Sequence, residues 1–208
     1  MMKNNLKYQK TERAIKQAVI KLINLEGLSK VTVQQISAYA NINRTTFYRH
    51  YLDNPDLTAK YRVHMIESLQ EIIDQELIAT NPQQNPGNPA TLFPLFQQII
   101  DFVAADWEFN RAWLGSHGDQ ETISKVVSLI DHSLKKKLGQ VQEQYDLHPT
   151  IPMAFAQELI VSQLWSIVKI WLRQAHPLSK DEIIDILIKT RYSSPFELTG
   201  VSNIKFNG

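Results

Sequence analysis

Apolar residues recur at helical spacing along most of this chain, and no segment alternates for long enough to predict a sheet. The first helical pattern covers residues 11–25, and Gly27 supplies a stop just after it. Residues 80–90 contain three prolines and one glycine, which predicts a loop. Further patterns predict helices at about 54–78, 91–105, 107–115, 119–138, 151–174 and 179–190. The chain is therefore predicted to be all-α.

Two short helices, 33–39 and 44–51, are predicted between the first helix and the long fourth one. Thr32 opens the first of them with a capping-box pattern, Thr-Val-Gln-Gln. In the four-residue turn that follows, Asn41 is well suited to a left-handed backbone, and Asn43 is a good N-cap for the second helix. Helix, short turn and helix is the geometry of a helix-turn-helix motif.

The long fourth helix sets the domain organisation. Asn54 is expected to be its N-cap, with Pro55 at the first helical position. The helix is long enough to leave a first three-helix bundle and enter a second one. We therefore expect a helix-turn-helix domain over residues 8–56, a larger C-terminal helical domain over 57–192 and an irregular tail over 193–208.

The second short helix carries basic and hydroxyl side chains and no acidic residue. In a helix-turn-helix motif, the first residues of this helix meet base edges in the major groove, where arginine pairs with guanine and threonine suits several bases. Residues further along leave the groove and meet phosphate oxygens. The candidate base-reading residues are Arg44, Thr45 and Thr46, and the candidate phosphate contacts are Tyr48, Arg49 and His50. Phe47 is the apolar residue expected to anchor the helix.

The charge distribution fits a polyanionic partner, although the net charge is only +1. Residues 1–60 carry ten Lys and Arg against four Asp and Glu, whereas residues 61–208 carry twelve against seventeen. A basic segment on a mildly acidic body is typical of nucleic-acid binding. The alternative is chance surface charge on a helical corner of a kind that also occurs in proteins that do not bind DNA.

Composition indicates a cytoplasmic protein. The chain has no cysteine, which excludes a disulfide framework and fits a reducing compartment. The first residues are basic and polar, without the apolar core of a signal peptide, and no run approaches the roughly 20 apolar residues of a membrane span. No contact with a membrane is expected.

The motif also resembles a known family. The pattern Thr-Val-x-x-Ile-Ser-x-x-Ala-Asn-Ile-Asn-Arg-x-Thr-Phe-Tyr-Arg-His-Tyr-x-x-Asn-x-x-Leu, residues 32–57, resembles the DNA-binding domain of TetR/AcrR-family transcriptional regulators, and the match covers about residues 8–60. The resemblance implies a homodimer on a palindromic operator in double-stranded DNA, with a C-terminal domain for dimerisation and for sensing a small molecule. It also implies phosphate contacts for Thr32, Asn43 and Tyr48, base reading for Arg44, Thr45 and Thr46, and a second backbone contact for His50.

Two positions depart from the family pattern. Asn41 stands where the family usually has glycine, and asparagine can adopt the same left-handed backbone. Asn54 stands where the family usually has a lysine that touches phosphate. Loss of one such contact is expected to flatten the salt dependence of DNA binding by about one unit of slope.

The C-terminal half gives a less specific match. Residues 159–172 (LIVSQLWSIVKIWL) and 178–183 (LSKDEI) are similar to a C-terminal type found in regulators associated with dihydroxyacetone kinase genes, among others. The similarity indicates a subgroup of the family rather than a ligand.

The last two long helical patterns are apolar on more than one face, so both helices are expected to be buried on two sides. One side would face the helices' own domain, and the other the same helix pair of a second subunit across a two-fold axis. A thick monomeric core is the alternative. The candidate dimer-interface residues are Phe155, Leu159, Leu164, Ile167, Trp171, Ile184 and Leu187.

Aromatic residues cluster between the fourth helix and this pair. An apolar pocket with a few polar groups is the usual form of a small-molecule site, and plain core is the alternative. The candidate residues of an effector pocket are His64, Phe96, Phe102, Trp107, Phe109, Trp113 and Trp165.

Two other classes of function compete with a DNA-binding regulator. An enzyme is disfavoured because the chain has no glycine-rich phosphate loop, nucleophile elbow or cysteine, and the segment 117–121 (HGDQE) lacks a partner at metal-ligand spacing. No catalytic residue, metal or cofactor is predicted. An adaptor that binds DNA weakly and answers to a protein partner is the second rival, but an adaptor has no physical need for the basic helix 44–50. The sequence favours a repressor and identifies neither ligand nor operator.

Overall fold

The structure is a computed structural model that describes residues 2–79, 93–145, 150–193 and 195–200. Every regular element within these ranges is helical, which confirms the all-α prediction. The elements in chain order are α1 (Met2–Glu26), the 3-10 turn η1 (Leu28–Lys30), α2 (Val33–Tyr39), α3 (Arg44–Tyr48), α4 (Asn54–Ala79), α5 (Phe93–Ala105), α6 (Trp107–Trp113), α7 (Gln120–Tyr145), α8 (Met153–Arg173), α9 (Lys180–Tyr192) and α10 (Pro195–Leu198). The predicted loop at 80–90 lies outside the described residues, and α10 adds one helical turn to the tail that was expected to be irregular.

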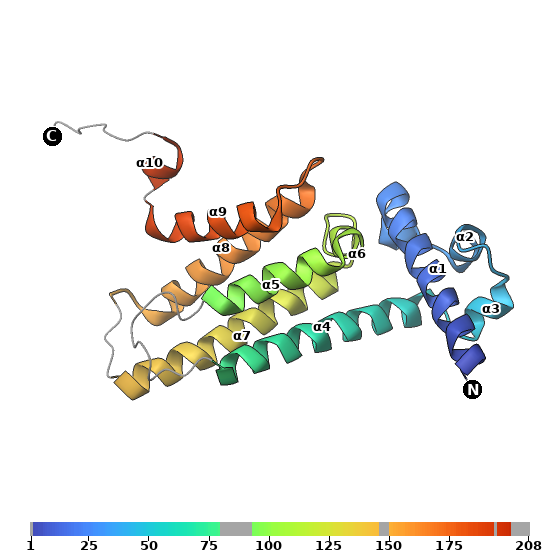
Figure 1. Ribbon diagram of the computed structural model, residues 1–208, viewed down its shortest axis with the longest axis horizontal. Helices are drawn as coiled ribbons and strands as arrows, with labels where there is room; N and C mark the ends of the chain where they lie inside the picture. The colour runs from blue at the N-terminus through green and yellow to red at the C-terminus, as the bar shows by residue number, and fades with distance from the viewer. Residues whose placement is uncertain (1, 80–92, 146–149, 194, 201–208) are drawn as a thin grey trace.

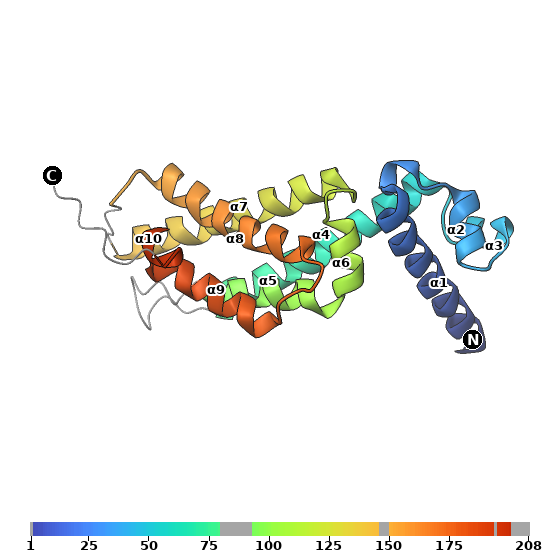
Figure 2. The same ribbon diagram turned by 90° about the horizontal axis from the view of Figure 1, so that it is seen from above.

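Helices α1, α2 and α3 gather at one end of an elongated molecule, and α4 runs from that end along the larger bundle (Figure 1). Within the bundle α4 packs against α5 and α7, while α8 packs against α7 and α9 against α5. Figure 2 shows the same division from above, with α8 and α9 on the side of the bundle that faces the viewer. The long fourth helix therefore starts beside α1, α2 and α3 and continues along the larger bundle.

The small bundle is built around three side chains with no exposed surface, Ile15 of α1, Ile36 of α2 and Phe47 of α3. All three belong to one apolar cluster. Full burial of a phenylalanine side chain contributes about 1.5–3 kcal/mol relative to leaving it exposed. Phe47 therefore fixes how α3 lies on the other two helices, as expected from the sequence.

The local signals of the motif are confirmed in detail. The Thr32 hydroxyl accepts from the backbone N–H of Gln35, and the Gln35 side chain accepts from the Thr32 backbone N–H, so the capping box is complete. Asn41 has φ +52°, the left-handed backbone predicted for the turn. The Asn43 side chain accepts the Thr46 backbone N–H at 2.6 Å, which starts α3 as an N-cap should.

Two boundaries differ from the prediction. Helix α3 ends at Tyr48 instead of continuing to Tyr51, because the backbone turns at Arg49 and His50. Helix α4 is capped by Asp53, whose carboxylate accepts the backbone N–H of Asp56 at 2.8 Å. Asn54, the predicted cap, is instead the first residue of the helix, and its side chain turns toward the small bundle.

The small bundle is fastened to the large one near the α6–α7 connection. The backbone N–H of Leu28 donates to the carbonyl of His117 at 2.9 Å. Arg62 of α4 donates to both carboxylate oxygens of Asp119, at 2.7 and 3.2 Å. Asp119 also accepts from the Thr122 hydroxyl at 2.6 Å, and that hydroxyl accepts from the indole N–H of Trp113 at 3.0 Å.

Acid is expected to weaken this junction. Burial raises the pKa of Asp119, but the hydrogen bonds from Arg62 and Thr122 outweigh burial and hold the pKa below its ordinary value. Because the folded pKa is lowered, the stabilisation is fully present above about pH 4 and is lost as the pH falls toward the lowered pKa. Asp119→Asn is expected to reduce the free energy of unfolding at pH 7 by about 1–3 kcal/mol, since the half-buried Arg62 loses its bidentate carboxylate partner and keeps only the exposed Glu121.

Urea unfolding followed by circular dichroism, at pH 7 and again at pH 3.5, would measure this effect. Asp185→Asn is the matched control, because its carboxylate pairs with Lys189 on the exposed surface of α9. Equal stability losses in the two variants at pH 7 would contradict the role assigned to Asp119.

Candidate functional site

The outer surface of α3 carries most of the predicted DNA-contacting side chains. Arg44, Thr45 and Arg49 are exposed, and Tyr48 exposes 53% of its surface. Thr32 and Asn43 are also exposed, and Thr46 is half-buried. Neither Arg44 nor Arg49 forms an ion pair with any described residue. The result is a basic, hydroxyl-bearing surface on which the guanidinium groups of Arg44 and Arg49 are free for an outside partner, whereas the Thr32 hydroxyl donates to the Gln35 side chain.

Asn54, where the family pattern has lysine, is engaged inside the small bundle. Its side-chain amide donates to the carbonyl of Val31 at 2.8 Å. Val31 immediately precedes Thr32, so this bond ties the start of α4 to the segment that leads into α2. In this chain position 54 therefore serves the packing of the small bundle and presents no charge to a phosphate.

His50 does not lie on the exposed surface predicted for it. Its side chain is only 5% exposed, and Nδ1 meets the carboxylate of Glu12 on α1. The imidazole also stacks on the ring of Tyr8, with 4.1 Å between ring centroids. The sequence pattern could not show this, because the partners lie about 40 residues earlier in the chain and come together only when α1 crosses the end of α3.

Glu12 is the shared partner at that crossing. Its second carboxylate oxygen accepts the hydroxyl of Tyr51 at 2.5 Å, and burial raises the pKa of Tyr51, so this hydroxyl stays protonated. On the other side, the Lys60 ammonium donates to the backbone carbonyl of His50 at 3.2 Å. The C-terminal end of α3 is thereby held between α1 and α4.

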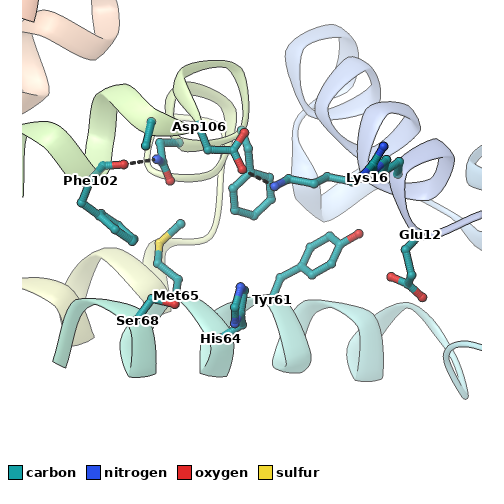
Figure 3. Close-up of a pocket in the computed structure, with 12 residues that line it drawn as sticks. Glu12, Lys16, Tyr61, His64, Met65, Ser68, Phe102 and Asp106 are labelled. Atoms are coloured by element: carbon teal, nitrogen blue, oxygen red, sulfur yellow. Dashed lines mark hydrogen bonds and ion pairs between the residues drawn. The ribbon is translucent and has the colours of Figure 1, made fainter. Parts of the chain in front are cut away.

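A cavity of about 330 Å³ opens beside this crossing, between α1, α4, α5 and α6 (Figure 3). Three of the predicted pocket residues, His64, Phe102 and Phe109, line it. Further residues, which were not predicted from the sequence, also line the cavity. These are Glu12, Arg13, Lys16, Tyr61, Met65, Ser68, Ala105, Asp106 and Asn110.

The other four predicted pocket residues lie elsewhere. Phe96 and Trp113 are buried core residues, 1% and 0% exposed, and Trp107 packs on Trp171 with 4.7 Å between ring centroids. Trp165 lines two smaller spaces of about 20 and 120 Å³. The spacing of the aromatic residues did not distinguish core positions from cavity-lining ones. Helical periodicity shows which residues face inward, but not whether a neighbouring helix packs against them or leaves a cavity. The charged cavity residues of α1 were missed because that helix was assigned to the other domain.

The predicted dimer residues divide into two groups. Phe155 and Leu159 of α8 are 66% and 61% exposed, and Ile170 and Ile188, which were not predicted, are 60% and 37% exposed. Four others are buried within the protomer, with exposures between 2% and 9%: Leu164, Ile167, Trp171 and Leu187. Ile184 is half-buried. These four side chains pack within the core of the protomer.

Positions 155, 159 and 170 fall on one stripe of α8 at helical spacing. Isolated exposed leucines are common on protein surfaces, but a row of large apolar residues on one helix marks an interaction surface. We call Phe155, Leu159, Ile170 and Ile188 the α8–α9 apolar face.

The residues that the structure describes do not form a metal site. They contain no group of three or more His, Asp or Glu side chains placed to hold a metal ion, and Asp119 and Glu121 of the HGDQE segment instead pair with Arg62. Within the same ranges, no helix is both long and apolar enough to cross a membrane.

Comparison with known proteins follows the division into two units. Residues 90–191 match the family model TetR_C_8, described as a transcriptional regulator C-terminal region. A TetR transcriptional regulator from Streptococcus agalactiae has a similar structure over 97% of this chain and 99% of its own, with a TM-score of 0.55 and 23% sequence identity. The chain has the TetR-family fold.

Two further solved structures of transcriptional regulators align over most of the chain. The alignment with the fatty acid degradation regulator FadR from Bacillus halodurans covers 86% of this chain and 92% of that protein's chain, with a TM-score of 0.62 and 17% identity. The alignment with NalD from Pseudomonas aeruginosa, a secondary repressor of a multidrug efflux pump, covers 88% of this chain and 95% of the NalD chain, with a TM-score of 0.62 and 18% identity. No curated protein sequence matches the chain. At identities of 17–23%, these similarities establish the fold.

Proposed function

We propose that the protein is a cytoplasmic transcriptional regulator that binds a palindromic operator in double-stranded DNA as a homodimer. The observation that carries the proposal is the surface of α3, where an intact helix-turn-helix presents unpaired arginines, hydroxyls and Tyr48 without an acidic side chain. Base edges in the major groove are read by such side chains at the start of the second helix.

The proposed contacts fall into three groups. Arg44, Thr45 and Thr46 read bases, while Thr32, Asn43, Tyr48 and Arg49 bind phosphate oxygens. His50 acts by position, because its buried imidazole holds the end of α3 against α1. These residues give the register on the duplex through phosphate contacts and the sequence preference through base contacts.

The α8–α9 apolar face supports the homodimer. An isologous contact between two such faces would bury large side chains that the protomer leaves in water, and two-fold symmetry is the usual arrangement of soluble oligomers. A dimer also places two α3 helices for half-sites one helical turn apart, about 34–36 Å.

We further propose that a small molecule controls operator binding and that the protein acts as a repressor. Because α4 belongs to both units, an effector that tilts α4 would change the separation of the two α3 helices. It can shift the equilibrium only through a difference in affinity for the two arrangements. Residues 159–172 are similar to regulators associated with dihydroxyacetone kinase genes, and we propose that the protein belongs to that subgroup.

Selection from a random pool of DNA duplexes tests the proposal directly. Purified protein at moderate salt is expected to enrich a two-fold palindrome whose half-sites are about one helical turn apart. Retention that is weak and independent of sequence would contradict it. That result would favour the adaptor controlled by a protein partner, which remains the second candidate.

A further inference from the structure

We propose that the cavity between α1, α4, α5 and α6 binds a compact organic anion with an apolar body, and that its occupant acts on α3 through Glu12. The first step needs only the geometry of the cavity. The second step rests on the DNA-binding function proposed above, and the two are tested separately.

The inner wall of the cavity suits an apolar body. Met65 and Phe109 are 3% and 7% exposed, and Phe102 packs beside them. Figure 3 shows Met65 and Phe102 at the inner end of the space, above α4. A volume of about 330 Å³ is at the lower end of the range for small-molecule sites, roughly 300–1,000 Å³. The site is therefore sized for a compact ligand.

The outer end carries four charged side chains, and three of them already have partners. Lys16 pairs with Asp106 and lies over the ring of Phe109, 4.4 Å from its centroid. Glu12 binds the side chains of His50 and Tyr51. Arg13 is exposed and forms no ion pair or hydrogen bond with any described residue. It is thus the uncompensated charge at this end, and a planar guanidinium matches a carboxylate or sulfonate in a bidentate geometry.

Tyr61 provides a neutral donor in the same space. Its hydroxyl is buried beside that of Tyr51, which already donates to Glu12, and it forms no hydrogen bond of good geometry with any described residue. Burial raises the pKa of Tyr61, so the hydroxyl keeps its proton near neutral pH. In Figure 3 the hydroxyl points from α4 toward α1, between Lys16 and Glu12. An anionic group beside Arg13 would give this poorly paired donor an acceptor, which favours the occupied cavity over the empty one.

Glu12 connects this cavity to the DNA-binding surface. The same carboxylate lines the cavity and fastens the end of α3 through His50 and Tyr51. An anion bound at Arg13, the residue next to Glu12, changes the electrostatic environment of the Glu12 carboxylate. It also occupies the space between α1 and α4. We expect occupancy to loosen the hold on α3 and so to weaken operator binding.

The site is tested with 2-naphthoate and its neutral isostere 2-naphthamide as probes. The full-length protein is labelled with ¹³C at the methionine methyl groups, and the Met65 signal is assigned from Met65→Leu. Naphthoate is expected to shift the Met65 signal and leave that of Met153, on α8, in place. A Met65 signal that does not respond to naphthoate would overturn the proposed site.

The charge preference is tested by calorimetric titration of the same two probes. Arg13→Gln is expected to weaken naphthoate binding about tenfold and to leave naphthamide binding unchanged, because the amide makes no ion pair. Lys10→Gln is the matched control, an exposed cation on the same helix that does not line the cavity. Equal losses in Arg13→Gln and Lys10→Gln, or no preference for naphthoate in the parent protein, would contradict an anion site.

The coupling is tested on the palindrome obtained by selection. Saturating naphthoate is expected to weaken operator binding at least threefold in the parent protein, and Glu12→Gln is expected to reduce this change. Unchanged or tighter operator binding would overturn the coupling and leave the site standing. If no palindrome is enriched although Met65 responds and Arg13→Gln weakens naphthoate, the DNA-binding function fails and the anion site stands.

Discussion

Replacing both Arg44 and Tyr48 with alanine is expected to weaken operator binding at least about a thousandfold and to leave folding unchanged. Each base-reading arginine contributes about 1–3 kcal/mol of discrimination, and each contact is made twice by a two-fold dimer. Both side chains are exposed, so their removal opens no cavity in the core. Fluorescence anisotropy with the selected palindrome measures the loss of affinity, and circular dichroism on heating checks the fold.

The matched control for this variant combines Tyr39→Ala with Arg173→Ala. Tyr39 lies on α2, is 47% exposed and packs under the ammonium of Lys21, and Arg173 is exposed at the end of α8. The control removes the same two side-chain types from other surfaces and is expected to keep operator affinity within about threefold. Similar losses in both double variants would show that general charge, and not the surface of α3, holds the DNA.

Leu159→Asp is expected to convert the proposed homodimer to monomers, with dimerisation at least about a hundredfold weaker. Burying a leucine contributes about 1.5–3 kcal/mol, an isologous interface contains two copies, and a desolvated carboxylate adds a further cost. The leucine is 61% exposed in the protomer, so the protomer should still fold. Analytical ultracentrifugation over a range of protein concentrations measures the change.

Leu25→Asp is the control for the dimer prediction. Leu25 is also 61% exposed, but it lies at the end of α1, far along the chain from α8. The control should sediment as the parent protein does. A dimer that persists in Leu159→Asp would place the interface on another surface, whereas monomers in both variants would indicate nonspecific loss of association.

Local signals explain why the small bundle could be predicted closely. The capping box at Thr32, the left-handed Asn41 and the cap at Asn43 each act within four residues, so sequence spacing specifies them. The boundary errors have a different cause. Asp53 and Asn54 are adjacent and both suit an N-cap, so the sequence spacing did not show which of them caps α4.

The larger bundle shows the limit of periodicity. A helix that is apolar on two sides is expected to be buried on two sides, yet the pattern does not say which side meets its own domain. Leu164 and Trp171 face the core, and Phe155 and Leu159 face outward, although all four share one helix. That division depends on where α7 and α9 lie, and thus on the tertiary arrangement.

The sequence by itself determined the helices, the helix-turn-helix and the basic surface of α3, because these follow from interactions between residues close in the chain. Only the tertiary structure decided the burial of His50, the shared role of Glu12 and the cavity beside Arg13. Each of these brings α1 together with residues about 40 to 100 positions later in the chain. No local pattern encodes such contacts, since the crossing of α1 over α3, α4 and α6 is fixed by the packing of the whole core.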